Sequence, residues 1–121
     1  MALTTEQAMQ QGVASHREGN LQEAERLYRA ILQTQPGHPD ANHNLGLIAL
    51  AANAAEAALP LFKTALEINP AVEQFWLSYI AVLIRLGLLE PAKGVLERAQ
   101  DLGFKIEKLE PLNRKLASTT N

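Results

Sequence analysis

The sequence predicts an all-α protein, a right-handed solenoid of three helical hairpins (six helices) with a capping helix at its C-terminal end. The first observation is a repeat: Ala24, Ala58 and Ala92 follow one another at equal intervals, and Tyr28 and Phe62 keep the same interval. The second is that each interval holds two stretches with apolar residues three and four positions apart, as on one face of an α-helix. Self-similarity at this period, with two helical patterns per unit, indicates stacked hairpins. The predicted parts are a single domain over 1–117, with units at about 5–38, 39–72 and 73–104, a capping helix at about 105–117, and a disordered tail at 118–121.

The first unit is expected to begin with a helix over residues 5–18, for which Thr4 or Thr5 is a suitable N-cap. Gly19 ends this helix, and a second helix is expected over 21–35. One face of the second helix is apolar because it gathers Ala24, Leu27, Tyr28, Ile31 and Leu32.

The second unit repeats this arrangement. Its first helix is expected to begin at His38 or Asp40, its second helix to cover 55–68, and Asn53 to take the turn between them. Pro60 falls a little past the first turn of the second helix, where the missing N–H and the ring normally disturb a helix. We therefore expect a kink or a late helix start at this residue.

The third unit is expected to form helices over 71–86 and 89–102. Pro91 falls in the first turn of the second of these, where proline is tolerated. The first is apolar nearly all round, so it should be covered on more than one side. The more polar segment 105–117 is expected to cover the open end, because a solenoid needs a polar cap there.

Composition narrows the class of function. The net charge of −2, from 11 basic and 13 acidic residues, provides no electrostatic attraction to nucleic acid or to an anionic membrane. The chain has no cysteine, which excludes thiol catalysis and cysteine-bound zinc and fits a reducing compartment. The N-terminal residues do not read as a secretory signal, and no apolar run reaches the ~20 residues that span a bilayer. We expect a cytoplasmic protein.

The spacings resemble the tetratricopeptide repeat (TPR), whose pattern is W-x2-L-G-x2-Y, then A-x3-F, then P. The resemblance covers about residues 5–104, and the residues that carry it are Gly12, Ala24, Tyr28, Pro36, Leu45, Gly46, Ala58, Phe62, Ala65, Pro70, Trp76, Tyr79, Leu83, Ala92 and Ala99. Two departures stand out: Asn42 replaces a usual large residue, and Ile80 occupies a position that is usually Gly or Ala. The bulkier Ile80 should push its helix pair apart or be accommodated nearby, for example by Gly94.

The resemblance implies a scaffold or adaptor that binds a peptide or helix of a protein partner, because in TPR proteins the first helix of each pair lines a concave groove. Carried onto this chain, the protein-binding groove comprises Met9, Val13, His16, Arg17, His43, Asn44, Leu47, Leu50, Gln74, Leu77, Ser78, Ala81 and Arg85. The alternative for each residue is an ordinary solvated helix face.

Some TPR proteins hold the acidic tails of chaperones with a clamp of two lysines, two asparagines and an arginine. The corresponding positions here are Met9, Val13, Asn44, Gln74 and Ser78, and only the asparagine matches the clamp. Without cations nothing balances a bound pair of carboxylates, so we predict no chaperone-tail binding. Arg17 and Arg85 remain candidates to hold an acidic group elsewhere in the groove.

No catalytic, cofactor or metal site is predicted. His38 and His43 are five residues apart, whereas two imidazoles share one helix face at i, i+4, and Asp40 and His16 do not complete a convincing ligand set. The chain also lacks a glycine-rich phosphate loop, a nucleophile elbow and an evident acid–base pair. We therefore predict that this chain is not an enzyme.

Two alternatives remain open. The phrases EAERLYRAIL and QFWLSYIAVLIRLG resemble bacterial chains in which TPRs precede a glycosyltransferase of the O-linked N-acetylglucosamine transferase type, or a sulfotransferase. There the repeats recruit substrate or mediate dimerisation without catalysing the reaction. The other alternative is a homodimer through the third repeat, in which the apolar helix around Phe75, Trp76 and Ile80 would supply the interface.

Overall fold

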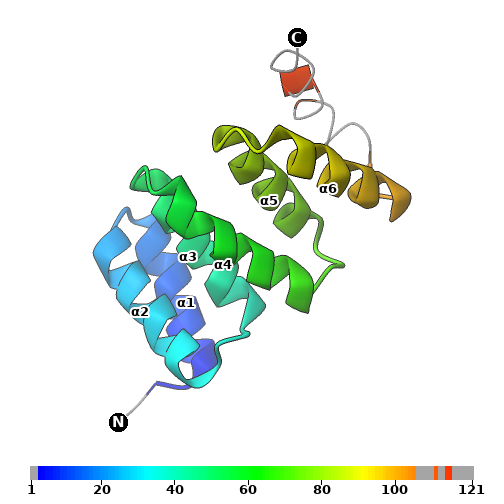
Figure 1. Ribbon diagram of the computed structural model, residues 1–121. Helices are drawn as coiled ribbons and strands as arrows, with labels where there is room; N and C mark the ends of the chain where they lie inside the picture. Colours follow the sequence, from blue (N-terminus) through cyan, green and yellow to red (C-terminus); the bar gives the residue numbers. More distant parts are fainter. Residues whose placement is uncertain (1–2, 106–110, 112–113, 116–121) are drawn as a thin grey trace.

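The computed structural model describes residues 3–105, 111, 114 and 115, and the part of the chain that it describes contains six α-helices and no strand. The helices pair into three hairpins, and each helix packs against the next one along the chain (Figure 1). The predicted all-α fold of three hairpins is therefore confirmed. The helix bounds are α1 Thr5–Arg17, α2 Leu21–Thr34, α3 Pro39–Ala51, α4 Ala55–Ile68, α5 Glu73–Arg85 and α6 Leu89–Asp101.

Local chemistry sets the ends of the helices. The side chain of Thr4 accepts the Gln7 N–H at 3.1 Å, and the Gln7 side chain accepts the Thr4 N–H at 3.0 Å, which together form a capping box. Of the two predicted caps, Thr4 is the one used. Each hairpin turn is made by a residue with positive φ, at Gly19 (80°), Asn53 (60°) and Gly87 (76°), which are equivalent positions of the three repeats.

Close contact between an aromatic ring and a glycine joins the helices of the first two hairpins. A Cβ added to Gly12 would lie 2.6 Å from Cε1 of Tyr28, and one added to Gly46 would lie 2.5 Å from Cε1 of Phe62. Only glycine leaves room for a ring at these positions, because the rings lie directly against the backbone of α1 and α3.

In the third hairpin the sizes of the two packing partners are reversed. Ile80 takes the place of the glycine and is fully buried, and Leu96 takes the place of the aromatic ring in the same apolar cluster. The larger side chain is therefore balanced by a smaller partner. Our suggestion that Gly94 accommodates Ile80 is wrong, since a Cβ at Gly94 would have no atom within 4 Å.

Pro60 does not delay the start of its helix. Helix α4 begins at Ala55, and the N–H of Ala58 already donates to the carbonyl of Ala54 at 3.1 Å. The expectation of a late start is wrong. Proline here removes one N–H from the ladder, and the buried Ala58, Phe62 and Ala65 of α4 hold the helix in place by packing.

The apolar residues of α5 lie in the interior of the molecule. Phe75, Trp76 and Ile80 are only 3%, 1% and 0% exposed, because they pack against residues of α4 and α6. These three side chains offer no apolar patch for a homodimer. The expectation that this helix is covered on more than one side is confirmed.

Two expectations concern the C-terminal end. Most of the capping helix predicted at 105–117 and all of the tail at 118–121 lie outside the described residues.

Among the helices that the structure describes, none is long and apolar enough to cross a bilayer.

Candidate functional site

A hollow of about 280 Å³ lies on the side of the fold that carries the predicted groove. Val13, His16 and Arg17 of α1, together with Asn44 of α3, line it and were all predicted groove residues. Its fifth lining residue is Tyr28 of α2. Four predicted side chains from two hairpins are thus brought together at one place.

Tyr28 was not among the predicted site residues. Its ring is buried because Gly12 lets it lie against the backbone of α1, and its hydroxyl accepts the Asn44 amide N–H at 3.4 Å. Burial raises the pKa of the Tyr28 phenol, and the bond from Asn44 opposes this only in part, so the hydroxyl stays neutral near pH 7. The sequence does distinguish Tyr28 from its equivalent in the second repeat: Tyr28 has a hydroxyl, which Phe62 lacks.

His43 and Ser78 are buried, at 5% and 6% exposed, and join α3 to α5. The Nε2 of His43 lies 2.7 Å from the Oγ of Ser78, which also accepts from the Gln74 amide at 3.4 Å. The imidazole lies near two aromatic rings, at 5.3 Å from the centroid of Phe62 and 4.9 Å from that of Phe75. These two predicted groove residues therefore bind each other and present little surface to a partner.

Burial also determines the charge of His43. Removal from water lowers the pKa of its imidazole, and the neighbouring Asn44 and the carboxylate of Asp40 offset part of this effect. His43 is therefore neutral near pH 7, as suits a ring that packs near two aromatic side chains.

The remaining predicted residues are spread along the same face. Met9, Leu47, Leu50 and Leu77 are half-buried against the apolar clusters, Ala81 is half-buried, and Gln74 is exposed. Arg85 donates to Oδ1 of Asn53 at 2.7 Å and lines a separate hollow at the hairpin turn. Arg17 and Arg85 therefore do not line the same hollow.

The histidines do not form a metal site in the residues that the structure describes, where no group of three or more His, Asp or Glu side chains could hold an ion. His38 instead caps α3, because its Nδ1 accepts the Ala41 N–H at 3.1 Å. Histidine is an unusual N-cap, and sequence reasoning missed this role.

The residues at the tryptophan position of the second and third repeats make equivalent contacts. Nε1 of Trp76 donates to the carbonyl of Pro70 at 2.7 Å, and Nδ2 of Asn42 donates to the carbonyl of Pro36 at 3.0 Å. The asparagine thus replaces the hydrogen bond of the indole without its bulk. Although Asn42 departs from the repeat pattern, it keeps the hydrogen bond between the inter-hairpin loop and the following helix.

Comparison with known proteins identifies the class. Residues 49–105 match the tetratricopeptide repeat family, and no curated protein matches. The fold is similar to the first TPR of Spaghetti (RPAP3) bound to the HSP90 peptide SRMEEVD, with 19% identity, a TM-score of 0.80, and 98% and 100% of the two chains covered. Residues 41 to the end of MamA from Desulfovibrio magneticus RS-1 give 22% identity and a TM-score of 0.80, but this chain spans 66% of that one and is itself covered over 95%.

The Yersinia enterocolitica type III secretion chaperone SycD, solved with a peptide of the translocator YopD, is also similar, at 18% identity and a TM-score of 0.76. That comparison covers 98% of this chain and 90% of SycD. At these identities the likeness is one of fold. Together with the family match over residues 49–105 and the repeated contacts described above, it shows that the chain has the fold of a tetratricopeptide repeat solenoid.

Proposed function

We propose that this protein is an interaction module that holds a peptide or helix of a protein partner on the face formed by α1, α3 and α5. The observation that carries the proposal is the hollow lined by Val13, His16, Arg17, Tyr28 and Asn44. It combines an apolar side chain with polar groups from two hairpins, the mixture that recognises a specific segment of another protein.

Arg17 is the charged group of this hollow. It is exposed, and among the described residues it forms no ion pair. A guanidinium in this state is available to a carboxylate or a backbone carbonyl of a partner. Arg17 is therefore the residue to change first.

The solved structures support the class of ligand. The Spaghetti domain was solved with a peptide of HSP90 and SycD with a peptide of YopD, and both share this fold. A chaperone tail is not the ligand that we propose here. The five clamp positions contain no cation, and one of them, Ser78, is already bonded to His43.

The test uses a photo-crosslinking amino acid, p-benzoylphenylalanine, at position 16 in the hollow or at the exposed position 22 of α2. Irradiation in cells should give adducts of discrete mass from position 16 only, which mass spectrometry then identifies. Arg17→Glu should abolish these adducts, whereas Arg29→Gln on α2 should not, and all variants should melt at the same temperature. Equal adducts from positions 16 and 22 would show that this face is not the partner site.

The second role, a recruiting domain within a larger transferase, rests on sequence resemblance alone. An immunoblot of the source cell with an antibody against this domain tests it. A band near 13.2 kDa, the mass of this chain, would contradict the role in a larger enzyme, and a much larger band would support it.

A further inference from the structure

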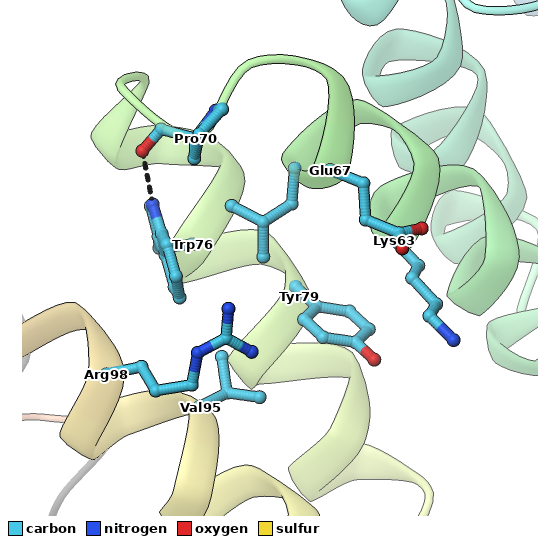
Figure 2. Close-up of a pocket in the computed structure, with 8 residues that line it drawn as sticks. Lys63, Glu67, Pro70, Trp76, Tyr79, Val95 and Arg98 are labelled. Carbon is cyan, nitrogen blue, oxygen red and sulfur yellow. Dashed lines mark hydrogen bonds between the residues drawn. The ribbon is translucent and has the colours of Figure 1, made fainter.

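A second hollow, of about 400 Å³, lies where α4, α5 and α6 meet (Figure 2). It is on the other side of α5 from the predicted groove. Successive helical residues are rotated by ~100°, so Trp76 and Tyr79, which line this hollow, point away from Leu77 and Ala81 of the groove face. The lining residues are Lys63, Leu66, Glu67, Pro70, Trp76, Tyr79, Val95 and Arg98.

Three lining residues from three helices carry hydrogen-bond donors: Lys63, Tyr79 and Arg98. In the view of Figure 2 the guanidinium of Arg98 lies on one side of the Tyr79 ring, and the ammonium of Lys63 lies on the other. Within the described residues none of the three has a hydrogen-bond or ion-pair partner. Lys63 and Arg98 are exposed and bring two positive charges, against the single negative charge of Glu67. The hollow therefore has an excess of positive charge and of donors.

Aromatic and apolar groups make up the rest of the wall. The guanidinium carbon of Arg98 lies 5.6 Å from the centroid of the Trp76 ring, a cation–π distance that positions this arginine over the ring. The indole N–H is already bonded to the carbonyl of Pro70 at 2.7 Å, and Trp76 is only 1% exposed, so it positions Arg98 and offers a partner neither a donor nor free ring surface. Leu66 and Val95 add aliphatic surface beside it.

The equivalent place between the first two hairpins lacks these features. One repeat earlier in the chain, the positions of Trp76, Tyr79 and Arg98 are occupied by Asn42, Leu45 and Thr64. The counterpart of Lys63 is Arg29, whose Nε is already paired with the Glu25 carboxylate at 3.3 Å. The stacked pair of Arg98 and Trp76 and the unpaired Lys63 are therefore specific to the second hollow and do not follow from repeat geometry.

We infer that this hollow binds an acidic peptide segment of a partner. One carboxylate would bond to Arg98 and a second to Lys63 and the Tyr79 hydroxyl, and a neighbouring Leu, Ile, Val or Pro would lie on Val95. Arg98 suits this role because its planar guanidinium can pair with a carboxylate while it stacks on the indole. The carboxylate of an Asp or Glu side chain and that of a chain terminus share this chemistry.

The test is affinity selection with the full chain from two pools of random, N-acetylated hexapeptides, one with amidated and one with free C-termini. Retained peptides should be rich in Asp or Glu beside an aliphatic residue or proline. Retention only from the free-acid pool would identify a terminal carboxylate, and retention from the amidated pool would identify side-chain carboxylates.

Variants then place the bound peptide. The double variant Lys63→Gln/Arg98→Gln should bind roughly tenfold more weakly, because each cation makes a charge-assisted hydrogen bond. Arg29→Gln, at the equivalent position of the first junction, and Arg17→Glu, in the groove hollow, should bind as the parent chain does. Circular dichroism checks that all variants fold. If the double variant does not fold, the single variants Lys63→Gln and Arg98→Gln are measured in its place.

Fluorescence supplies a second readout, because Trp76 is the only tryptophan of the chain and lines the hollow. Titration with the selected peptide should change its emission, and the same peptide with Gln and Asn in place of its acids should not. The inference is overturned if no acidic peptide is retained, if the Lys63 and Arg98 variants bind as well as the parent, or if Arg17→Glu alone abolishes binding. The last outcome would leave the proposed groove function intact.

Discussion

Gly46 shows how a single missing side chain controls the packing of a hairpin. Its α-carbon faces the ring of Phe62 so closely that a Cβ would come within 2.5 Å of it. We predict that Gly46→Ala lowers the free energy of unfolding by about 1–3 kcal/mol, the usual cost of overpacking a core. Urea denaturation followed by circular dichroism measures this.

Gly94 provides the matched control for that substitution. It lies inside α6, and a Cβ there would meet nothing within 4 Å. Gly94→Ala should therefore raise the free energy of unfolding by roughly 0.5–1 kcal/mol, because alanine loses less backbone entropy than glycine in a helix. Equal effects of the two substitutions would contradict the packing described for Gly46.

His43 should make stability depend on pH. Burial lowers the pKa of its imidazole in the folded state, so below about pH 6.5 the unfolded chain binds more protons at this residue than the folded chain does. Its contribution to stability is full above that pH and is lost as the pH falls through the lower pKa of the folded state. Urea midpoints measured between pH 7.5 and 5 should decrease.

Two variants separate this effect from other titrating groups. His43→Gln should reduce the pH dependence of the midpoints, whereas His16→Gln, outside the contact between α3 and α5, should leave it in place. A steep dependence that survives His43→Gln would assign the effect to other residues.

Among the structural elements, the hairpin turns depend on backbone conformation. Gly87 has a φ of 76°, and a Cβ added to it would have no atom within 4 Å, so any cost of a side chain there comes from the backbone alone. We predict that Gly87→Ala costs about 1–2 kcal/mol, the penalty of the left-handed region for L-residues. Thermal melts by circular dichroism give the comparison.

Asparagine should be tolerated better than alanine at that turn. Asn53 occupies the equivalent turn of the second hairpin at a φ of 60°, and asparagine adopts this conformation more readily than other non-glycine residues. Gly87→Asn should thus destabilise the chain less than Gly87→Ala does. The opposite order would show that the turn is not limited by φ.

For the protein as a whole, stability should follow the order of stacking. Helices α3 and α4 have a packed neighbour on each side, whereas α1 contacts α2 and lies at one end of the stack (Figure 1). In a solenoid each unit is stabilised by its neighbours, so amide hydrogen exchange should be slowest in α3 and α4 and faster in α1. Exchange mass spectrometry measures this, and faster exchange in α3 than in α1 would contradict it.

Much of the fold could be predicted because its determinants are local. The constant repeat interval, the apolar spacing within each helix, the cap at Thr4 and the turn residues at Gly19, Asn53 and Gly87 can all be read along the chain. A helix turns by a constant angle per residue, so spacing alone shows which side chains share one of its faces. The candidate groove residues followed from the resemblance.

Which side chains meet in each site depends on contacts between residues far apart in the sequence. These contacts form only when the chain is folded. His43 and Ser78 were both predicted for the groove, yet they bond to each other across α3 and α5, with the rings of Phe62 and Phe75 packed near the imidazole. The hydroxyl of Tyr28 reaches Asn44 because Gly12 has no side chain in its way.

The second hollow has the same origin. Lys63, Tyr79 and Arg98 come from three helices, and no spacing along the chain relates their directions. The pattern of residues along the chain was thus enough to specify the helices, their pairing and the faces that they present. How those faces meet depends on the volumes of the side chains between them, as the exchange of a glycine–aromatic pair for Ile80 and Leu96 illustrates.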